Sequence, residues 1–269
     1  MKKLIAVDLD GTLLNSKNEI SPMTKDAIHQ SLWAGHQVVI ITGRDYYGSV
    51  HVARELFENT GGLLSSSNGA NVYDLKSGRS LIDHTIPRDT AEDMVDYGLS
   101  LGFDYIIYYD GKIQVARPDA YDVDYLSKKN KLPIKVDPDL REKIGQIDLN
   151  KVLFSARAEE IDKHIGAFRD KFSPIVNPIH SMPQYLDCMP KGINKGVSLL
   201  EIADHYGISH DNTIAFGDEV NDIEMIKAAG CGVAMGNAKA ELKEMADVVC
   251  GTNDADGIGR FILGEVLGK

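Results

Sequence analysis

Four short segments of the chain place charged and hydroxyl-bearing residues directly after, or beside, runs of apolar residues. Short continuous apolar runs predict strands that are buried on both faces of a parallel sheet, and ligands bind beyond the carboxyl ends of such strands. The residues at those ends are therefore the candidates for a functional site. The segments are Asp8-Leu9-Asp10-Gly11-Thr12, Thr42-Gly43-Arg44, Asn194-Lys195-Gly196 and Gly217-Asp218-Glu219-Val220-Asn221-Asp222.

Carboxylates dominate these segments. Residues two apart on a strand point the same way, so Asp8 and the start of Asp10 can face one crevice before Gly11 turns the chain. Asp218, and Asp222 one helical turn later, would bring further carboxylates to the same edge. So many like charges at close range cannot all stay ionised without a cation. Mg²⁺ is the best candidate, because it binds through one or two carboxylates together with water and phosphate.

The elements that must position these residues form an alternating pattern. Ser21 and Pro22 mark the start of a helix and Gly35 its end, and residues 195–206 and 219–229 are also helical in pattern. Strands are expected at the apolar runs 4–7, 38–41, 62–64, 213–216, 232–235 and 248–250. Strands that alternate with helices predict an α/β domain with a doubly wound parallel sheet.

The middle of the chain has a different pattern. Asp110-Gly111 lies between two β-rich runs and predicts a two-residue hairpin. Residues 150–172 then read as a strand followed by a helix, and residues 173–190 as strands interrupted by prolines. We therefore expect an inserted α+β domain at 83–190, which splits the core domain into 1–82 and 191–269.

Composition excludes several classes of partner. The chain has 29 basic and 40 acidic residues, for a formal net charge of −11, which is the wrong sign for binding nucleic acid. Three cysteines without CxxC spacing (Cys188, Cys231 and Cys250) indicate a reducing, cytoplasmic compartment and core positions. Asp8 interrupts the first apolar run, and no stretch approaches a transmembrane length, so neither a leader nor a membrane partner is expected. The sequence does not indicate an oligomeric state.

The four segments, in order, resemble the four motifs of the haloacid dehalogenase (HAD) superfamily of phosphohydrolases. The motifs are "DLDGT", "TGR", "NKG" and "GDEVND". The large insert between the second and third motifs, together with "SSNGA" at residues 66–70, is similar to the Cof-type branch, subclass IIB, which includes sugar phosphatases. The resemblance implies a HAD-type, Rossmann-like core with an inserted cap, and phosphatase activity that depends on Mg²⁺.

The resemblance also implies catalytic roles. Asp8 would be the nucleophile that forms an aspartyl-phosphate, and Asp10 the acid that protonates the leaving alcohol and then the base that activates water. Asp8, Asp10 (through its backbone carbonyl) and Asp218 would hold the metal. Asp222 would support these ligands without binding the metal directly. Thr42 would bond to the transferring phosphoryl group.

Lys195 would balance the charge of the phosphoryl group and hold Asp8 in place. Lys191 is a competing cation, but only Lys195 stands in the Asn-Lys-Gly arrangement of the family. Five further residues are expected at the phosphate or at the opening of the site: Leu9, Gly43, Arg44, Asn68 and Asn221.

The insert would close over the crevice and select a small phosphorylated metabolite, such as a sugar phosphate. Candidate recognition residues are Tyr108, Tyr109, Arg117, His180 and Tyr185, although side chains of these types more often serve packing. A hexose phosphomutase of the same superfamily would carry the same four motifs. A phospho-aspartate signalling receiver is the alternative of another class. A receiver would be much shorter and would have no large insert before its lysine.

Overall fold

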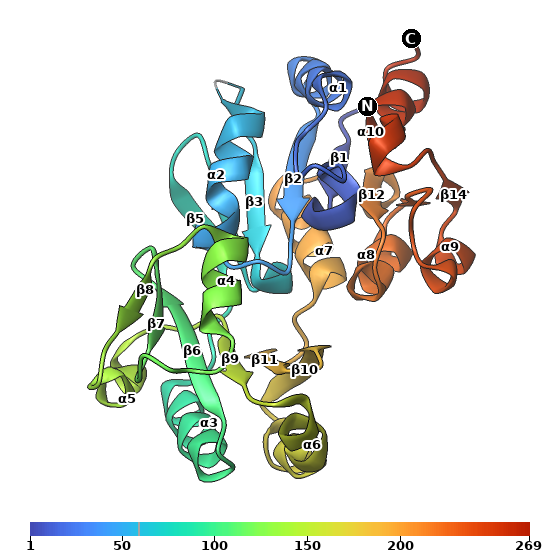
Figure 1. Cartoon of the computed structure of the whole chain (residues 1–269). Helices are drawn as coiled ribbons and strands as arrows, with labels where there is room; N and C mark the ends of the chain where they lie inside the picture. The colour runs from blue at the N-terminus through green and yellow to red at the C-terminus, as the bar shows by residue number, and fades with distance from the viewer. Residues whose placement is uncertain (59) are drawn as a thin grey trace. The chain divides into compact units, whose positions relative to one another are not determined.

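In the computed structural model, which describes residues 1–58 and 60–269, the chain forms two compact units (Figure 1). The first, here called the core unit, consists of Met1–Ile82 and Asn194–Lys269. The second, the insert unit, consists of Asp83–Ile193. The core unit thus resumes at Asn194, three residues after the position 191 that the sequence pattern suggested.

The core unit is built on a sheet with the strand order β14-β13-β12-β1-β2-β3-β4-β5. All pairs from β14 to β3 are parallel, as the apolar runs predict. The strands are β1 (Leu4–Val7), β2 (Gln37–Ile41), β3 (Leu63–Ser66), β4 (Asn71–Asp74), β5 (Arg79–Asp83), β12 (Thr213–Gly217), β13 (Cys231–Ala234) and β14 (Val248–Val249). The helices are α1 (Pro22–Trp33), α2 (Tyr46–Phe57), α7 (Lys195–His205), α8 (Ile223–Ala228), α9 (Ala240–Met245) and α10 (Gly257–Phe261).

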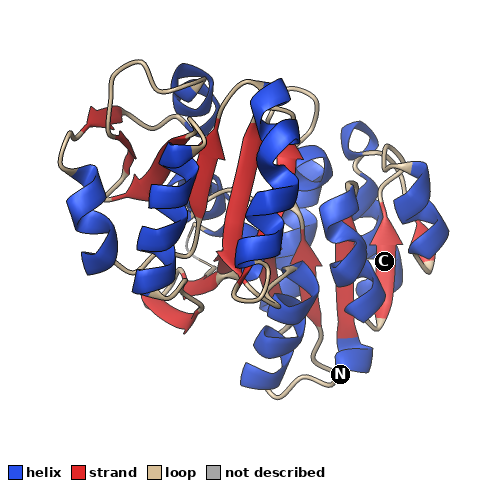
Figure 2. Cartoon of the chain, turned by 90° about the horizontal axis from the view of Figure 1, so that it is seen from below, coloured by secondary structure: helices blue, strands red, loops and turns tan. Residues whose placement is uncertain are grey.

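The strand order reverses direction at β1. The chain moves from β1 to β2 and β3 on one side, and from β12 to β13 and β14 on the other. Because parallel crossovers are right-handed, the crossover helix α1 covers one face of the sheet and the crossover helices α8 and α9 cover the other. The C-terminal α10 packs on α1, whereas α7 packs on α8, and Figure 2 shows helices on both faces. This is the doubly wound α/β fold, and its reversal point places the crevice next to the end of β1.

Local sequence explains the elements that lead to this crevice. Every residue of β1 is fully buried, because β1 lies between β12 and β2 in the middle of the sheet. The Ser21 hydroxyl accepts the Thr24 N–H at 3.2 Å and begins α1, with Pro22 as the first helical residue. Gly35, with φ of +90°, follows the end of α1 and turns the chain into β2.

The β4 and β5 strands were not expected from the sequence. The β4 strand pairs antiparallel with β3, and β5 is the outer strand beyond it. Arg79–Asp83 has no buried residue and only two apolar ones, Leu81 and Ile82, so this edge strand lacks the continuous apolar run that marks the central strands.

The insert unit contains a second sheet, with the strand order β10-β11-β9-β6-β7-β8. Its pairs are antiparallel except β7 with β8. The strands are β6 (Asp104–Tyr109), β7 (Lys112–Val115), β8 (Ile134–Val136), β9 (Val152–Ser155), β10 (Val176–Met182) and β11 (Tyr185–Pro190). The helices are α3 (Arg88–Ser100), α4 (Val123–Asn130), α5 (Leu140–Lys143) and α6 (Ala158–Phe172).

The turn chemistry of the insert unit confirms two sequence predictions. Asp110 and Gly111 join β6 to β7 with φ of 53° and 69°, as a two-residue hairpin of this type requires. Pro178 lies in β10, which is an edge strand, where a missing N–H is tolerated. The side chains of α3 and α6 share one apolar cluster of this unit, and those of α4 belong to another.

All three cysteines are free, and only Cys188 is fully buried, whereas Cys231 and Cys250 are half-buried at the margin of the core. Among the described residues, no helix has both the length and the apolar character needed to cross a membrane.

Candidate active site

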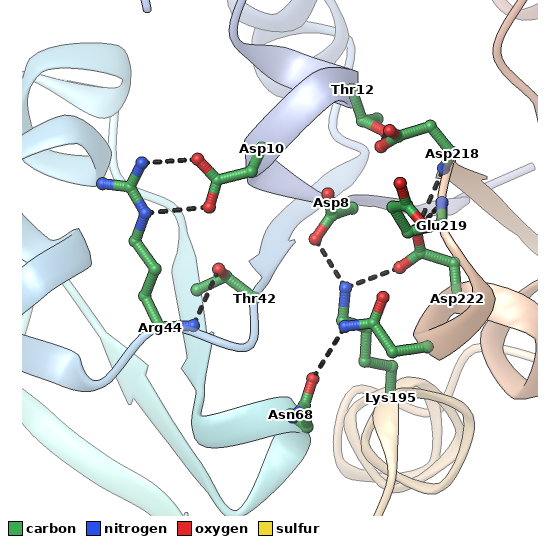
Figure 3. A network of polar contacts seen from close by, with 11 residues as sticks. Asp8, Asp10, Thr12, Thr42, Arg44, Asn68, Lys195, Asp218, Glu219 and Asp222 are labelled. Carbon is green, nitrogen blue, oxygen red and sulfur yellow. Dashed lines mark hydrogen bonds and ion pairs between the residues drawn. The ribbon is translucent and has the colours of Figure 1, made fainter. Parts of the chain in front are cut away.

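The motif residues of the core unit converge at the carboxyl edge of its parallel strands (Figure 3). Asp8 directly follows β1, Thr42 follows β2, and Asp218 follows β12. Lys195 is the first residue of α7, where the Asn194 side chain accepts the Val197 N–H at 2.9 Å and so begins the helix. Four segments that are far apart in the sequence thus supply one site.

A buried ion network forms the centre of the site. The Lys195 ammonium lies 2.5 Å from Asp8 Oδ1 and 2.5 Å from Asp222 Oδ1. The side chains are 1% exposed for Lys195, 8% for Asp8 and 0% for Asp222. Lys195 and not Lys191, which is exposed, is therefore the cation that contacts Asp8.

Asp218 and Asp222 are fixed by the start of the segment after β12. Asp222 Oδ2 accepts the backbone N–H groups of Asp218 at 2.9 Å and Glu219 at 3.0 Å. Asp222 therefore closes the turn and contacts Lys195 at the same time. The Thr12 hydroxyl donates to Asp218 Oδ1 at 2.6 Å, which joins this segment to the turn after β1.

Gly11 allows the turn after β1 to approach Asp218. Its φ is +80°, and a Cβ atom at this position would lie 2.3 Å from Asp218 Oδ2. Any other residue type would therefore meet both an unfavourable backbone conformation and a collision with the carboxylate. The glycine of the first motif is needed for its lack of a side chain.

The electrostatics of the site favour a bound cation. Burial raises the pKa of Asp8 well above its ordinary value, even though Lys195 opposes the effect. Burial also raises the pKa of Asp218 from 3.8 to about 6, which the bond from Thr12 partly offsets. Oxygen atoms of Asp8, Asp218 and Asp222 lie within 4.8 Å of one another. One lysine faces three buried carboxylates, so the donor set suits a hard, oxygen-binding cation.

The Asp10 carboxylate does not share this cluster. Arg44 binds it through two parallel contacts, Nε to Oδ2 at 2.9 Å and Nη2 to Oδ1 at 2.5 Å. Figure 3 shows Asp10 turned toward Arg44 and Asp8 turned toward Lys195. The two carboxylates therefore have different partners in this structure, and because β1 ends at Val7, strand alternation does not extend to Asp10.

The other predicted residues surround this centre. The Thr42 hydroxyl is buried and accepts the Arg44 N–H at 3.1 Å. The Asn221 side chain donates to Asn68 Oδ1 at 3.1 Å, and Gly43 lies against both amides. The Leu9 side chain is fully buried in the core, so only its backbone could reach a ligand.

Two residues that contact the site were not assigned from the sequence. Thr12 stands within the first motif but received no role, although its hydroxyl holds Asp218. Asn237 donates to the Gly11 carbonyl at 2.8 Å. It follows the apolar run 232–235 by two residues, so the rule that directs attention to the ends of strands could have found it.

Comparison with known proteins identifies the family. The model of the haloacid dehalogenase-like hydrolase family matches residues 5–262. The chain belongs to this family. This haloacid dehalogenase-like hydrolase is 33% identical, over 96% of each chain, to 5-amino-6-(5-phospho-D-ribitylamino)uracil phosphatase YitU of Bacillus subtilis.

Solved structures extend the likeness to the fold. A haloacid dehalogenase-like hydrolase from Bacteroides thetaiotaomicron has a TM-score of 0.90 and 31% identity, and the match covers 98% of this chain and 99% of that one. The subclass IIB sugar phosphatase BT4131 has a TM-score of 0.76 and 25% identity over 99% of each chain. The resemblance to the Cof-type branch is confirmed, and the protein is a phosphatase of the haloacid dehalogenase superfamily.

Proposed function

We propose that the protein is a Mg²⁺-dependent phosphatase that hydrolyses small phosphate monoesters, such as sugar phosphates or related metabolites, through an aspartyl-phosphate on Asp8. The observation that carries this proposal is the buried Asp8 carboxylate, held by Lys195 beside two further carboxylates at the reversal point of the sheet. Membership of a phosphatase family supports the reaction class.

The residues present fit a magnesium ion. Asp8 and Asp218 would hold it through carboxylate oxygens, and Asp10 through its backbone carbonyl. Both oxygens of Asp222 already have partners, so Asp222 supports the other ligands from behind. When bound, the ion would offset the carboxylates and polarise the phosphoryl oxygens.

In this proposal the reaction proceeds in two displacements at phosphorus, first by Asp8 and then by water. An oxygen of Asp8 attacks phosphorus, the ester P–O bond breaks, and Asp10 gives its proton to the leaving alcohol. Asp10 then takes a proton from water, whose oxygen attacks phosphorus, and the bond between Asp8 and phosphorus breaks to release phosphate. To act in this way, the Asp10 carboxylate has to leave the ion pair with Arg44.

Two further residues bind and orient the phosphoryl group. Lys195 holds Asp8 in place and offsets the charge of the transferring group. The Thr42 hydroxyl accepts the Arg44 N–H, so its own proton is available to donate to a phosphoryl oxygen.

The insert unit is the proposed cap that selects the substrate. Three of the five candidate recognition residues, Tyr108, Arg117 and Tyr185, already have structural partners within this unit. The Tyr108 hydroxyl accepts the Asn130 side-chain amide at 3.3 Å. Arg117 binds Asp104 through contacts of 2.6 and 2.9 Å, and the Tyr185 hydroxyl donates to Asp122 Oδ2 at 2.7 Å. Tyr109 is 44% exposed. His180 lies 3.0 Å from the Pro183 carbonyl and 3.9 Å from Asp162 Oδ1, which are contacts at the surface of this unit. These two residues are better placed to contact a ligand.

Phosphate release from a substrate panel tests the proposal. The panel contains sugar phosphates, nucleotides, pyridoxal phosphate, flavin mononucleotide and the ribitylaminouracil phosphate on which the YitU relative acts, each with MgCl₂ or EDTA. Asp8→Asn should release no phosphate, whereas Asp204→Asn, which changes an aspartate 71% exposed on α7, should match the wild type. Activity of Asp8→Asn, or full activity in EDTA, would contradict the proposal. Conversion of a hexose phosphate to its isomer without phosphate release would instead identify a mutase.

A further inference from the structure

Asn237, which lies outside the four motifs, contacts the turn that follows β1. Within this turn the Leu13 N–H bonds to the Asp8 carbonyl at 3.1 Å and the Leu14 N–H to the Leu9 carbonyl at 2.9 Å. The Gly11 carbonyl takes no part in those bonds and instead accepts the Asn237 side-chain amide at 2.8 Å. The amide therefore fixes the peptide group at the point where the turn adopts its left-handed conformation.

The Asn237 side chain is itself held at both ends. Its Oδ1 accepts the Asn253 N–H at 3.0 Å while its Nδ2 donates to Gly11, so the orientation of the amide is determined. The backbone on either side is also tied, through the Gly236 N–H to the Gly251 carbonyl at 3.0 Å and the Ala238 N–H to the Met235 carbonyl at 2.9 Å. Asn237 is exposed, but these bonds fix its amide, so the amide can hold the Gly11 peptide group in place.

The same loop also reaches the second segment of the proposed metal site. The Lys239 N–H donates to the Asp218 carbonyl at 2.9 Å, two residues after Asn237. The loop after β13 thus bonds to the turn after β1 and to the end of β12. These two segments carry Asp10 and Asp218. The distance between these residues would determine how well both can bind one shared ligand.

We propose that Asn237 is a positioning residue that holds the backbone of the turn after β1 at the correct distance from Asp218. The inference rests on the proposed function, because the Asp10 carbonyl next to Gly11 is the proposed backbone ligand of Mg²⁺. Asn237 contacts no substrate in this scheme and acts through the Gly11 carbonyl. Partners of this kind behind metal ligands typically change metal affinity or activity by about 10- to 100-fold.

Asn253 provides a matched control. Its Nδ2 donates to the Leu14 carbonyl at 2.8 Å, which is a bond of the same type and length to the far end of the same turn. The Asn253→Ala substitution removes this bond and the bond that Asn253 Oδ1 accepts from the Asp254 N–H at 3.1 Å, but leaves the backbone N–H that holds Asn237. Asn237→Asp keeps the acceptor for Asn253, loses the donor to Gly11 and places a carboxylate oxygen against the Gly11 carbonyl. Its negative charge would by itself attract Mg²⁺, so a weaker response to MgCl₂ would arise at the Gly11 carbonyl and not from lost attraction for the metal.

Two assays test the proposal. The first follows Mg²⁺ binding through the rise in Tm that MgCl₂ alone produces. The second follows steady-state hydrolysis of p-nitrophenyl phosphate as a function of MgCl₂. Asn237→Ala and Asn237→Asp should need about tenfold more MgCl₂ to reach half of the maximal Tm rise and half of the maximal activity. In both variants the decrease in kcat should be larger than the increase in KM. Asn253→Ala should stay within about twofold of the wild type in both assays, because its lost bond is remote from the ligands. A wild-type response to MgCl₂ in Asn237→Asp, or an equal defect in Asn253→Ala, would overturn the proposal.

A metal-free measurement separates this inference from the proposed function. Hydrogen exchange in EDTA of the backbone amides in residues 9–13 should be at least about tenfold faster in Asn237→Ala than in Asn253→Ala, because only the former releases the Gly11 carbonyl. If the wild type shows no response to MgCl₂, the proposed function fails, and the exchange rates alone decide whether Asn237 positions the turn. Equal exchange rates in the two variants would overturn the inference.

Discussion

Replacing Asp218 with asparagine should make the metal-free protein more stable above pH 6. The Asp218 carboxyl is 8% exposed, and burial raises its pKa from 3.8 to about 6. This difference in pKa corresponds to about 3 kcal/mol, at about 1.4 kcal/mol for each pKa unit. Asparagine removes the charge but keeps the side-chain oxygen that accepts the Thr12 hydroxyl.

The sign of the pH dependence follows from the raised pKa. Below pH 3.8 the carboxyl is protonated in both the folded and unfolded states, so its ionisation costs nothing. Between pH 3.8 and about 6 the unfolded chain has released this proton while the folded protein retains it, so the free energy of unfolding falls as the pH rises. Above pH 6 the full cost of the buried charge is present.

Urea unfolding of the wild type and Asp218→Asn in EDTA at pH 4 and pH 8 measures this effect. The variant should gain up to about 3 kcal/mol at pH 8 and little at pH 4. MgCl₂ should stabilise the wild type and leave the variant unchanged, while Asp204→Asn should follow the wild type throughout. A variant that is less stable than the wild type at pH 8 in EDTA would refute the reasoning.

Three further predictions concern other parts of the site and the insert. Lys195→Met should lower the free energy of unfolding by about 3 kcal/mol or more in urea titrations, because it leaves buried carboxylates without their cation. Gly11→Ala should raise the MgCl₂ concentration for half-maximal activity at least tenfold, which is about the loss expected when a metal site is disturbed. Gly78→Ala is the control, because Gly78 has a φ of +71° but open space around it, and it should affect only stability. Exchange of residues 83–193 for those of a relative should change the ranking of substrates while p-nitrophenyl phosphate is still hydrolysed. A folded chimera without any phosphatase activity would show that the insert supplies chemistry.

Much of the site could be located from the sequence, because each candidate follows a continuous apolar run. Parallel strands place their carboxyl ends at one edge, so Asp8, Thr42 and Asp218 had to lie close together once the runs were read as strands. The Asn-Lys-Gly segment begins a helix, as the sequence pattern predicted, and the structure adds that Asn194 caps it. These inferences depend only on local pattern and on the geometry of the fold class.

The partners of individual side chains could not be read in the same way. Arg44 was considered for phosphate binding, yet in the structure it binds Asp10. Asn237 contacts Gly11 across 226 positions of sequence. Contacts of this kind depend on where loops from different strands meet, which no local periodicity encodes.

The sequence by itself determined the alternating elements, the interrupted core and the order of the four motifs, because apolar periodicity and turn residues act within a few positions of the chain. Only the tertiary structure decided that Asp222 shares the cation of Asp8 and that Asp10 binds a different one. Lys195 joins Asp8 to Asp222, while Arg44 holds Asp10 apart from them. The physical reason is that an ion pair depends on distances set by the packing of the whole sheet, and a shift of a few ångströms changes the partner that a charge selects.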